Sequence, residues 1–423
     1  MDSPDSVAPR RYANGVATRE AILDAANELA IETGFAGVSL RELAVRTGIS
    51  HPGLLRHFAS TDEVLLALLD RHERANEAWV AEAGILGAGS TLALVELAEH
   101  NATVPGYVEL FTTLAGEAAS AAHPAHARFA LRYESLRELS ARQFRQSVDE
   151  GLVTAAIAPH DEAVRLAAAW DGLQLQSLYD PVVDVPELLR GHLVWLTGGS
   201  ATAPAALARA CAVLPAGPAA LGEATASGEI ATRGYAVGRA RRDEIVDEAM
   251  KLFAASGFRG TSLQEIAQSV GISKATLLHH FGSKDNLLIA VLRRRDERAP
   301  LGVPAPTTAP LELVTGLADG ARQNAGEPGL VELYSVLAAE SANPEHPGHE
   351  FFRDRFQTGR AYFTAMFAAL AADGRLPRGA DPAFEAAWLL ALWDGLQLQW
   401  LYDPAAVDVA EQLRGHLGRL VVA

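Results

Sequence analysis

Residues 257–281 read GFRGTSLQEIAQSVGISKATLLHHF and contain closely spaced signals for helix starts and ends. Ser262 followed by Glu265 is the capping-box pattern that begins a short helix. Gly271 is the residue type that most often ends one. Ser273 is a second N-cap residue, and the apolar residues after it recur at helical spacing. The stretch therefore predicts two short helices joined by a tight turn.

The same stretch occurs a second time in the chain, 223 residues earlier. Residues 34–58 read GFAGVSLRELAVRTGISHPGLLRHF, and residues 170–181, WDGLQLQSLYDP, match residues 393–404, WDGLQLQWLYDP, at the same offset. LRGHL, which begins at Leu189, recurs at Leu413 after a one-residue insertion. The chain therefore carries two complete copies of one unit of roughly 200 residues. We call them copy 1 and copy 2. The Gly-, Ala-, Pro- and Ser-rich segment between them is predicted to be a linker.

Copy 1 shows the same helix signals as copy 2. An apolar stripe that includes Ile22 and Leu29 predicts a first helix of about four turns, ending at Gly34. Ser39 with Glu42 forms a capping-box pattern, and Ser50 caps a third helix whose apolar contacts would come from Leu54, Leu55 and Phe58. Pro52 falls in the first turn of that helix, where its missing N–H has no intrahelical partner, so the helix is expected to form.

The bulk composition narrows the possible classes of protein. A chain of 423 residues is longer than one core usually holds, no apolar run is long enough to span a bilayer, and Cys211 is the single cysteine. The formal net charge is −16, but residues 9–74 hold 8 Lys/Arg against 9 Asp/Glu and residues 232–298 hold 12 against 8. The acidity therefore lies mostly outside the two helix-turn-helix segments, which stay candidates for a polyanion-binding surface. We expect a cytoplasmic protein that does not associate with membranes.

The order of glycine, cap, alanine and phenylalanine positions in both copies resembles the N-terminal DNA-binding domain of the tetracycline-repressor (TetR) family of transcriptional regulators. The resemblance covers about 45 residues in each copy. It implies an all-α fold of two TetR-like units, each with a three-helix helix-turn-helix domain and a C-terminal helical domain that binds a ligand and dimerises. The domains expected are a helix-turn-helix domain at 16–63, a ligand-binding domain at 64–197, a linker at 198–238, a second helix-turn-helix domain at 239–286 and a second ligand-binding domain at 287–423.

The resemblance also implies which residues would contact double-stranded DNA. In copy 2 they are the N-cap Ser273, then Lys274, Thr276 and His279 near base edges and Ser262, His280 and Lys284 near phosphates. In copy 1 the matching positions are Ser50, His51, Gly53, Arg56, Ser39, His57 and Thr61. Both copies depart from the family at Leu55 and Leu278, where a phosphate-binding tyrosine is common, and Thr61 replaces a lysine. Copy 1 is thus expected to bind more weakly or with different specificity, or else to be a degenerate domain kept for packing.

The function implied is that of a ligand-responsive regulator, most often a repressor. The WDGLQLQ and LRGHL helices of the two copies would pair within one chain, giving unequal half-sites, or each chain would pair with another chain. The effector is unknown, and no cofactor or metal is expected. Candidate pocket residues are Tyr107, Phe111, Phe129, Trp170, Gln174, Tyr334, Phe352, Trp393 and Gln397.

Three alternatives remain open at this point. The pairs His123/His126 and His346/His349 have a spacing that could hold a metal, but adjacent prolines favour helix starts. An enzyme is disfavoured, because no motif brings Asp171, Ser177 and His192 together. The third alternative is a ligand-binding or protein-interaction module with one or both DNA-binding domains inactive, which the net acidity favours.

Overall fold

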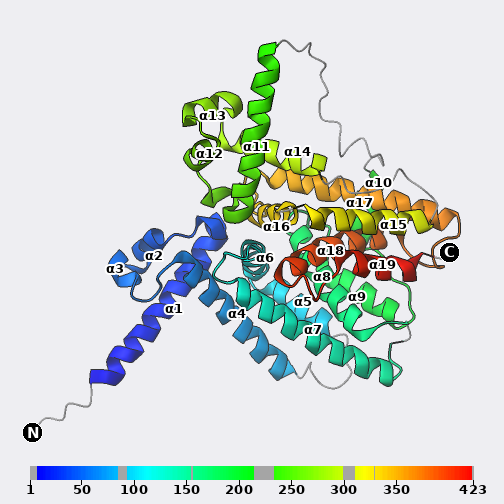
Figure 1. The fold of residues 1–423 in the computed structure, drawn as a ribbon. Coiled ribbons are helices and arrows are strands. Elements are labelled where there is room, and N and C mark those ends of the chain that lie inside the picture. The colour runs from blue at the N-terminus through cyan, green and yellow to red at the C-terminus, as the bar shows by residue number, and fades with distance from the viewer. Residues whose placement is uncertain are drawn as a thin grey trace, which may run out of the picture. The chain divides into compact units, whose positions relative to one another are not determined.

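The computed structural model describes residues 7–83, 93–153, 156–213, 233–298, 310–327 and 329–421. Every regular element in these ranges is a helix, which confirms the all-α prediction (Figure 1). They divide into two compact units, the first within residues 1–87 and 97–114 and the second within 88–96 and 115–423. The second unit thus joins all of copy 2 to the last helices of copy 1, so the predicted boundary between residues 63 and 64 does not coincide with a unit boundary.

The first unit contains the helix-turn-helix of copy 1. Its elements are α1 (Val7–Thr33), the 3-10 turn η2 (Phe35–Gly37), α2 (Leu40–Thr47), α3 (His51–Leu54), α4 (Thr61–Ala83) and parts of α5 (Ala93–Thr103) and α6 (Tyr107–Glu117). Ile22, Leu43 and Leu54 are fully buried and hold α1, α2 and α3 together. At 27 residues, α1 is nearly twice the predicted four turns, because it also extends toward the N-terminus over residues that lack an apolar stripe.

The second unit contains three long helices of copy 1, namely α7 (His126–Asp149), α8 (Pro159–Ser177) and α9 (Val185–Leu196). The predicted linker is partly helical, since α10 (Ala205–Val213) lies within it and buries Leu207 completely. The alternation of Ala and Leu with few charges suits a short packed helix as well as a linker. Residues 214–232 of that predicted linker lie outside the described residues.

Copy 2 supplies the remaining helices of the second unit. They are α11 (Arg233–Gly260), α12 (Leu263–Val270), α13 (Lys274–Phe281), α14 (Lys284–Arg298), α15 (Pro310–Gly326), α16 (Leu330–Glu340), α17 (His349–Ala372), α18 (Pro382–Tyr402) and α19 (Val409–Leu420). Gly257 interrupts α11 with a φ of 68°, in the left-handed region that favours glycine, just as Gly34 ends α1 with a φ of 76°.

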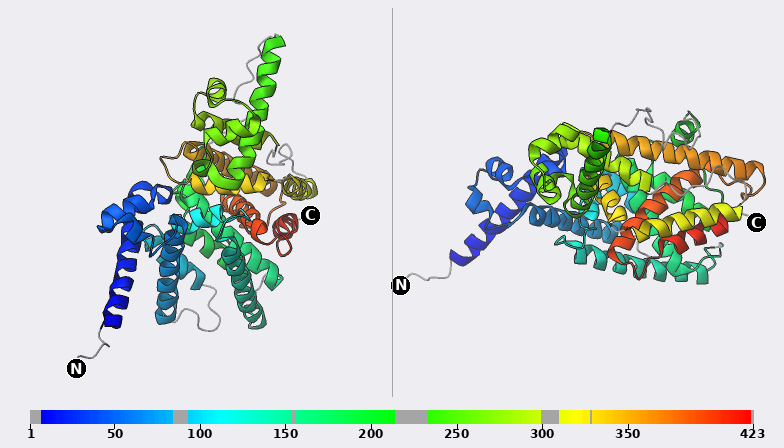
Figure 2. Two further views of the ribbon diagram at one scale, coloured as in Figure 1. Left: turned by 60° about the vertical axis from the view of Figure 1, so that its left-hand side comes forward. Right: turned by 45° about the horizontal axis from the view of Figure 1, so that its top comes forward.

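Helices α8 and α9 of copy 1 pack against α18 and α19 of copy 2, and we call this contact the seam. Figures 1 and 2 show the orange-red helices α18 and α19 beside the green helices α8 and α9. Gly172 lies against the backbone of Ala391, and its equivalent Gly395 lies against the backbone of Ala168. A Cβ at either glycine would overlap a carbonyl oxygen of the opposite helix. The two glycines therefore allow α8 and α18 to approach closely. No helix among the described residues is long and apolar enough to cross a membrane.

Candidate functional site

The helix-turn-helix of copy 2 has complete helix caps. Ser262 accepts a hydrogen bond from the Glu265 N–H (3.1 Å), and Glu265 accepts one from the Ser262 N–H (2.6 Å), closing the predicted capping box. This hydrogen bond lowers the pKa of the Glu265 carboxyl. Ser273 accepts from the Thr276 N–H (3.0 Å) and begins α13. Each cap of this kind stabilises its helix by about 1 kcal/mol, so the eight-residue α13 starts at a defined residue.

Helix α13 has one buried and one exposed face. Leu277 and Phe281 are buried against the neighbouring helices, while Lys274, Thr276 and His279 are exposed. His280 is half-buried. An amphipathic helix with this arrangement can lie in a major groove with its first turns toward the base edges.

The corresponding helix of copy 1 is shorter than the sequence predicts. Helix α3 has only four residues and continues as a turn up to Phe58, with the Arg56 N–H donating to the Gly53 carbonyl at 3.3 Å, a three-residue spacing. Ser50 caps it as predicted, accepting from the Gly53 N–H (3.2 Å). Gly53 in the middle of so short a helix weakens it, and Pro52 contributes no N–H.

Two further predictions for copy 1 are wrong. Leu55 was expected to make apolar contacts, but it is 43% exposed, because the tightened backbone turns it away from the core. Glu42 was expected to complete a capping box. Its N–H donates to Ser39 (3.2 Å), but its carboxylate lies 3.7 Å from Arg46 Nε, and Arg46 also pairs with Glu32. The arginine, which copy 2 lacks at this position, draws the carboxylate away from the cap.

The other residues expected to contact DNA in copy 1 lie at the surface. Ser39, Ser50, His51 and Arg56 are exposed. Gly53, His57 and Thr61 are half-buried. In copy 2, Lys284 is also half-buried; its ammonium group donates to the Phe258 carbonyl and lies 4.2 Å from the centre of the Phe258 ring.

We call α3 and α13 the reading helices. An arginine that sequence reasoning missed contacts the C-terminal end of each one. Arg19 Nη1 donates to the His57 carbonyl (2.7 Å), and its guanidinium carbon lies 3.9 Å from the centre of the Phe58 ring. Arg242 does the same for the His280 carbonyl (2.6 Å) and the Phe281 ring (4.2 Å). A cation near free C-terminal carbonyls stabilises a helix end. The signal was available, since both arginines sit 223 residues apart in aligned positions.

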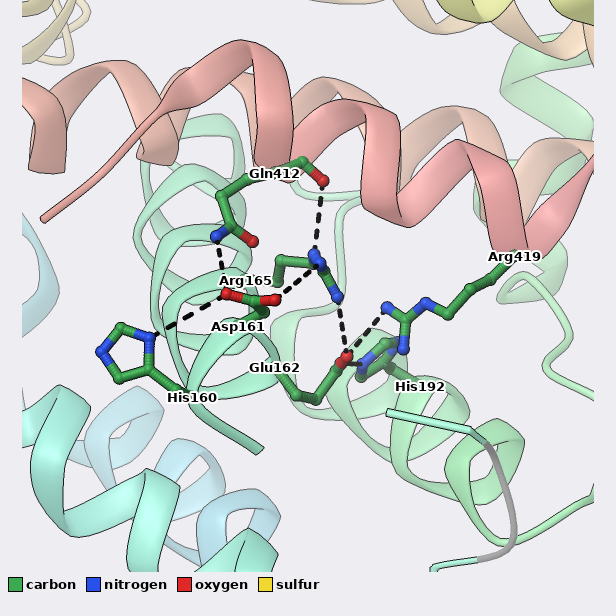
Figure 3. Close-up of polar contacts among 7 residues, drawn as sticks. All are labelled: His160, Asp161, Glu162, Arg165, His192, Gln412 and Arg419. Carbon is green, nitrogen blue, oxygen red and sulfur yellow. Dashed lines mark hydrogen bonds and ion pairs between the residues drawn. The ribbon is translucent and has the colours of Figure 1, made fainter. Parts of the chain in front are cut away.

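At the seam, a buried carboxylate of copy 1 faces cations from both copies (Figure 3). Glu162 is fully buried; its Oε1 lies 2.7 Å from His192 Nε2, and its Oε2 lies 2.8 Å from Arg419 and 3.4 Å from Arg165. Burial alone would raise the pKa of Glu162. The hydrogen bond with His192 and the charges of Arg419 and Arg165 outweigh it and hold that pKa well below its ordinary value. Arg165 Nε also donates to the Gln412 carbonyl (3.3 Å).

The equivalent position in copy 2 has a different environment. Glu385 is buried, and burial together with the nearby charge of Asp381 raises its pKa to about 8. Trp388 occupies the place of Arg165, and the His192 ring stacks on it with centroids 4.1 Å apart. Trp195 occupies the place of Arg419 and lies 5.3 Å from its guanidinium carbon. Both tryptophans therefore lie against partners of Glu162, and copy 2 has a tryptophan where copy 1 has Arg165.

Other contacts between the two copies occur twice, once from copy 1 to copy 2 and once, between the equivalent residues, from copy 2 to copy 1. The Tyr402 hydroxyl donates to the Ala115 carbonyl (2.5 Å), and the Tyr179 hydroxyl donates to the Ala338 carbonyl. Arg137 pairs with Asp403 (2.7 Å), and its equivalent Arg360 pairs with Asp180. These repeated contacts give the seam an approximate twofold arrangement.

Both His-x-x-His pairs lie at helix starts. The Nδ1 atoms of His123 and His346 accept from backbone N–H groups two residues on, while Nδ1 of His126 and of His349 contacts a backbone carbonyl eight residues earlier. Helices α7 and α17 begin at the second histidine of each pair. Among the described residues, no cluster of three or more His, Cys, Asp or Glu could hold a metal.

Copy 2 contains a narrow cavity inside its C-terminal helices. It has room for about one water molecule, a volume of about 20 Å³, and reaches about 420 Å³ only when the open space at its mouth is counted. It is lined by residues of α14 to α18: Arg295, Asn324, Tyr334, Arg355, Phe356, Gly359, Leu390, Trp393, Asp394 and Gln397. Burial raises the pKa of Asp394 to about 7, although Arg355, Tyr334 and Arg295 act to lower it.

Tyr334, Trp393 and Gln397, which were expected to line a pocket, lie in this cavity wall. Phe352 does not, since it is buried beside Tyr334 and Tyr179. Sequence reasoning missed the charged members, Arg295, Arg355 and Asp394. Tyr334 and Trp393 are apolar enough to be chosen as pocket candidates, whereas nothing in a helical pattern separates a buried arginine from an exposed one.

The expected pocket residues of copy 1 lie apart from this cavity. Phe129 is buried and stacks on Tyr402 at the seam, with centroids 5.8 Å apart. In α8, Gln174 is buried and Trp170 is half-buried. Tyr107 and Phe111 are buried in α6, where the Tyr107 ring lies 5.6 Å from His72.

Comparison with known proteins identifies the helix-turn-helix segments. The family described as "Bacterial regulatory proteins, tetR family" matches residues 22–68 and again residues 245–291. These are the segments that hold α2 with α3 and α12 with α13. A second family, "BetI-type transcriptional repressor, C-terminal", matches residues 336–422. Both helix-turn-helix segments belong to the tetR family.

Individual relatives agree with this family over the helix-turn-helix alone. The HTH-type transcriptional regulator RutR of Escherichia coli strain K12 is 46% identical over 55 residues, which are 13% of this chain and 26% of RutR. The negative transcriptional regulator IcaR of the biofilm operon icaADBC of Staphylococcus aureus strain Newman is 48% identical over 46 residues, 11% of this chain and 25% of IcaR. The chain thus matches about a quarter of the length of these curated relatives.

Solved structures of bacterial regulators match the chain at low similarity. A regulator from Agrobacterium tumefaciens shares 23% identity and a TM-score of 0.39, covering 44% of this chain and all of the other. NalD, the secondary repressor of the MexAB-OprM multidrug efflux pump in Pseudomonas aeruginosa, shares 23% identity and a TM-score of 0.35, covering 44% of this chain and 98% of NalD.

Proposed function

We propose that this chain is a DNA-binding transcriptional regulator, and specifically a repressor that responds to a small-molecule effector. The observation that carries the proposal is the exposed face of α13, where Lys274, Thr276 and His279 project from a fully capped helix-turn-helix. Membership of both helix-turn-helix segments in the tetR family and the repressor names of the chain's relatives support the same function. A lysine at the first position of the helix suits either a phosphate or a guanine edge.

We propose further that the chain reads an operator with two unequal half-sites. Copy 1 offers His51, Gly53 and Arg56 where copy 2 offers Lys274, Thr276 and His279. Its reading helix is also half as long, with four residues against eight. A shorter helix with fewer cations releases fewer counterions, so the copy 1 half-site contributes less to affinity and to its salt dependence.

The seam supports the pairing of the two copies inside one chain. It joins α8 and α9 to α18 and α19 with a close approach at the repeated glycines. The repeated tyrosine and arginine contacts link the ends of α8 and α18 to neighbouring helices of the other copy, so each chain would act as a pseudo-dimer. Size-exclusion chromatography with light scattering tests this directly. A mass near the 44.8 kDa of one chain supports it, and twice that mass at micromolar concentration contradicts it.

The function itself is tested by selecting DNA from a random pool and measuring fluorescence anisotropy on the selected sequence at several salt concentrations. Lys274→Ala is expected to weaken binding about tenfold, corresponding to one base or phosphate contact. The matched control is Lys251→Ala. That lysine is exposed on α11, away from the reading helix in sequence, and pairs with Glu248 at 2.9 Å. Binding that does not resist competitor DNA, or equal effects of the two variants, would contradict the proposal.

The effector is proposed to act in the C-terminal domains by favouring one of two arrangements of the reading helices. The second candidate function is a ligand-binding or protein-interaction module that does not bind DNA. The short α3 and the net charge of −16 favour it. An absence of salt-sensitive DNA binding in the selection experiment would establish this second candidate.

A further inference from the structure

The cavity of copy 2 is bounded by ionised and amide groups from five helices. Arg295 comes from α14, Asn324 from α15, Tyr334 from α16, Arg355 from α17, and Asp394 with Gln397 from α18. Most of these residues are at least nine-tenths buried, and the Arg295 residue is 3% exposed. Ligand sites in proteins combine an apolar wall with a few converging polar groups, and Phe356, Leu390 and Trp393 provide that wall here.

Two polar atoms in the cavity wall have no hydrogen-bond partner within the described part of the chain. They are Arg295 Nε, a donor, and Asp394 Oδ2. Buried polar atoms are nearly always paired in native proteins, so an unpaired donor and an unpaired carboxyl oxygen, on two residues that line one cavity, indicate a missing partner. A single ligand group could reach both if it accepts from the arginine and from a protonated carboxyl group.

The charges around the cavity disfavour a cation. Arg295 and Arg355 share one carboxylate, Asp296, at 3.0 and 2.6 Å. Their guanidinium carbons also lie 4.3 and 5.3 Å from the centre of the Tyr334 ring, so the protein itself supplies the cations for this aromatic side chain. A cationic ligand would have to approach two arginines. An anion would meet a positive excess whenever Asp394 is protonated.

Asp394 is placed to hold a proton near neutral pH. The groups that face it are Arg295 of α14, Tyr334 of α16 and Arg355 of α17, and Asp296 pairs with both arginines. Burial outweighs their combined effect and raises the pKa of Asp394 to about 7. Placing a negative charge beside it would favour the protonated form further.

Copy 1 shares part of this set, with Asn101, Arg132, Trp170, Asp171 and Gln174 at the positions equivalent to Asn324, Arg355, Trp393, Asp394 and Gln397, and differs in the rest. At the positions equivalent to Arg295, Tyr334, Phe356 and Gly359 it has His72, Phe111, Tyr133 and Leu136. The arginine with the unpaired Nε is replaced, and the glycine that leaves space in the wall becomes a leucine. The two copies therefore cannot bind one ligand in the same way.

We propose that the cavity of copy 2 is a site for a small organic anion, such as a carboxylate, that accepts from Arg295 and from a protonated Asp394, and that each chain binds one such anion. The inference rests on the proposed function in that it names the chemical class of the effector. Binding of the anion is then coupled to uptake of a proton. A single site in a two-copy chain would make the response to the effector asymmetric.

The test uses the full chain and three probes of one shape that differ in charge, benzoate, benzamide and benzylammonium, with acetate as a smaller anion. Isothermal titration calorimetry without DNA is expected to show benzoate binding at one site per chain, at least tenfold more tightly than benzamide, and no binding of benzylammonium. Above pH 7 the affinity for benzoate should fall about tenfold per pH unit, because the proton on Asp394 becomes scarce. Asp394→Asn should remove this pH dependence and retain binding.

Arg295→His, which installs the copy 1 residue, is expected to weaken benzoate at least tenfold, and Arg295→Lys should do so while keeping the charge, because it lacks Nε. Asp171→Asn, the equivalent of Asp394→Asn in copy 1, is the control and should leave benzoate binding unchanged. Equal binding of benzoate and benzamide, tighter binding of benzylammonium, two sites per chain, or no binding of either anion would overturn the proposal. DNA anisotropy of the same preparation shows separately whether the proposed function fails.

Discussion

Replacing Glu162 by Gln tests the charged side of the seam. The carboxylate is fully buried and lies within 3.4 Å of nitrogen atoms of His192, Arg165 and Arg419. Glutamine keeps the shape and removes the charge. It leaves Arg419 beside Arg165, whose side chain is 7% exposed, with Asp161, 3.9 Å from Arg165, as the remaining carboxylate. Breaking one partner out of a buried ion pair costs roughly 3–5 kcal/mol.

The side chain of Arg419 is 19% exposed but its guanidinium nitrogens are buried, so a cost within that range of about 3–5 kcal/mol is expected. Glu385→Gln is the matched control, since it makes the same change at the equivalent position of copy 2. There the pKa is raised to about 8, so most of the carboxyl is already protonated at pH 7. Glutamine resembles that form, and the free energy of unfolding should change by less than about 1 kcal/mol.

Urea unfolding followed by tryptophan fluorescence measures the difference, because Trp195 and Trp388 both lie at the seam. A chain with two compact units can unfold in more than one step, so the transition that moves with Glu162→Gln identifies the unit that contains the seam. Combining Glu162→Gln with Arg419→Leu should give much less than the sum of the two single effects, since each breaks the same pair. If Glu162→Gln costs no more than Glu385→Gln, the carboxylate does not hold the seam together.

Three further results are expected. Gly395→Ala should destabilise the chain by about 3 kcal/mol, because its Cβ would overlap the Ala168 carbonyl. Gly418→Ala, with no atom near its Cβ, should stabilise the chain slightly. Thermal unfolding compares the two variants, and equal effects would contradict the close approach at the seam. Between the ordinary pKa of 4.5 and the raised value of about 8, Glu385 is more protonated in the folded chain than in the unfolded chain. Its contribution to the free energy of unfolding should therefore fall with rising pH in that window, by up to about 1.4 kcal/mol per pH unit. Glu385→Gln should flatten this slope in urea titrations. Changing His51→Lys, Pro52→Ala and Gly53→Thr together should lengthen α3. Fluorescence anisotropy should then show about tenfold higher affinity for a symmetric operator built from two copy 2 half-sites. Unchanged affinity would show that copy 1 does not contact that DNA.

The sequence allowed most of the fold to be predicted, because its signals are local. Serine caps, left-handed glycines and apolar stripes located the helices of both copies, and the repeat located the second set from the first. The errors were local as well. A helix can extend beyond its apolar stripe, as α1 does, and a helix with the correct cap can still be short, as α3 is with Gly53 inside it.

The site was harder to predict because it depends on which residues meet in space. The sequences of the two helices do not indicate that Glu162 would face Arg419, since the two residues are more than 250 positions apart. The sequence likewise does not distinguish Arg295 and Asp394 from exposed charged residues of a helix. Only packing reveals that they are buried and that one atom of each lacks a partner.

The seam also bears on which copies pair with each other. Across it, Arg419 of copy 2 pairs with Glu162 of copy 1, and its guanidinium carbon lies 5.3 Å from the ring of Trp195, the copy 1 residue equivalent to Arg419. If two copy 1 units paired with each other, each Glu162 would face a tryptophan in place of Arg419. If two copy 2 units paired, each Glu385, whose pKa is raised, would face an arginine. Trp388, which stacks on His192 in the observed pair, would lie beside them. The ion pair between Glu162 and Arg419 forms where unlike copies meet and would be lost between two copy 1 units, so we expect the seam to favour pairing of unlike copies over pairing of two copy 1 units.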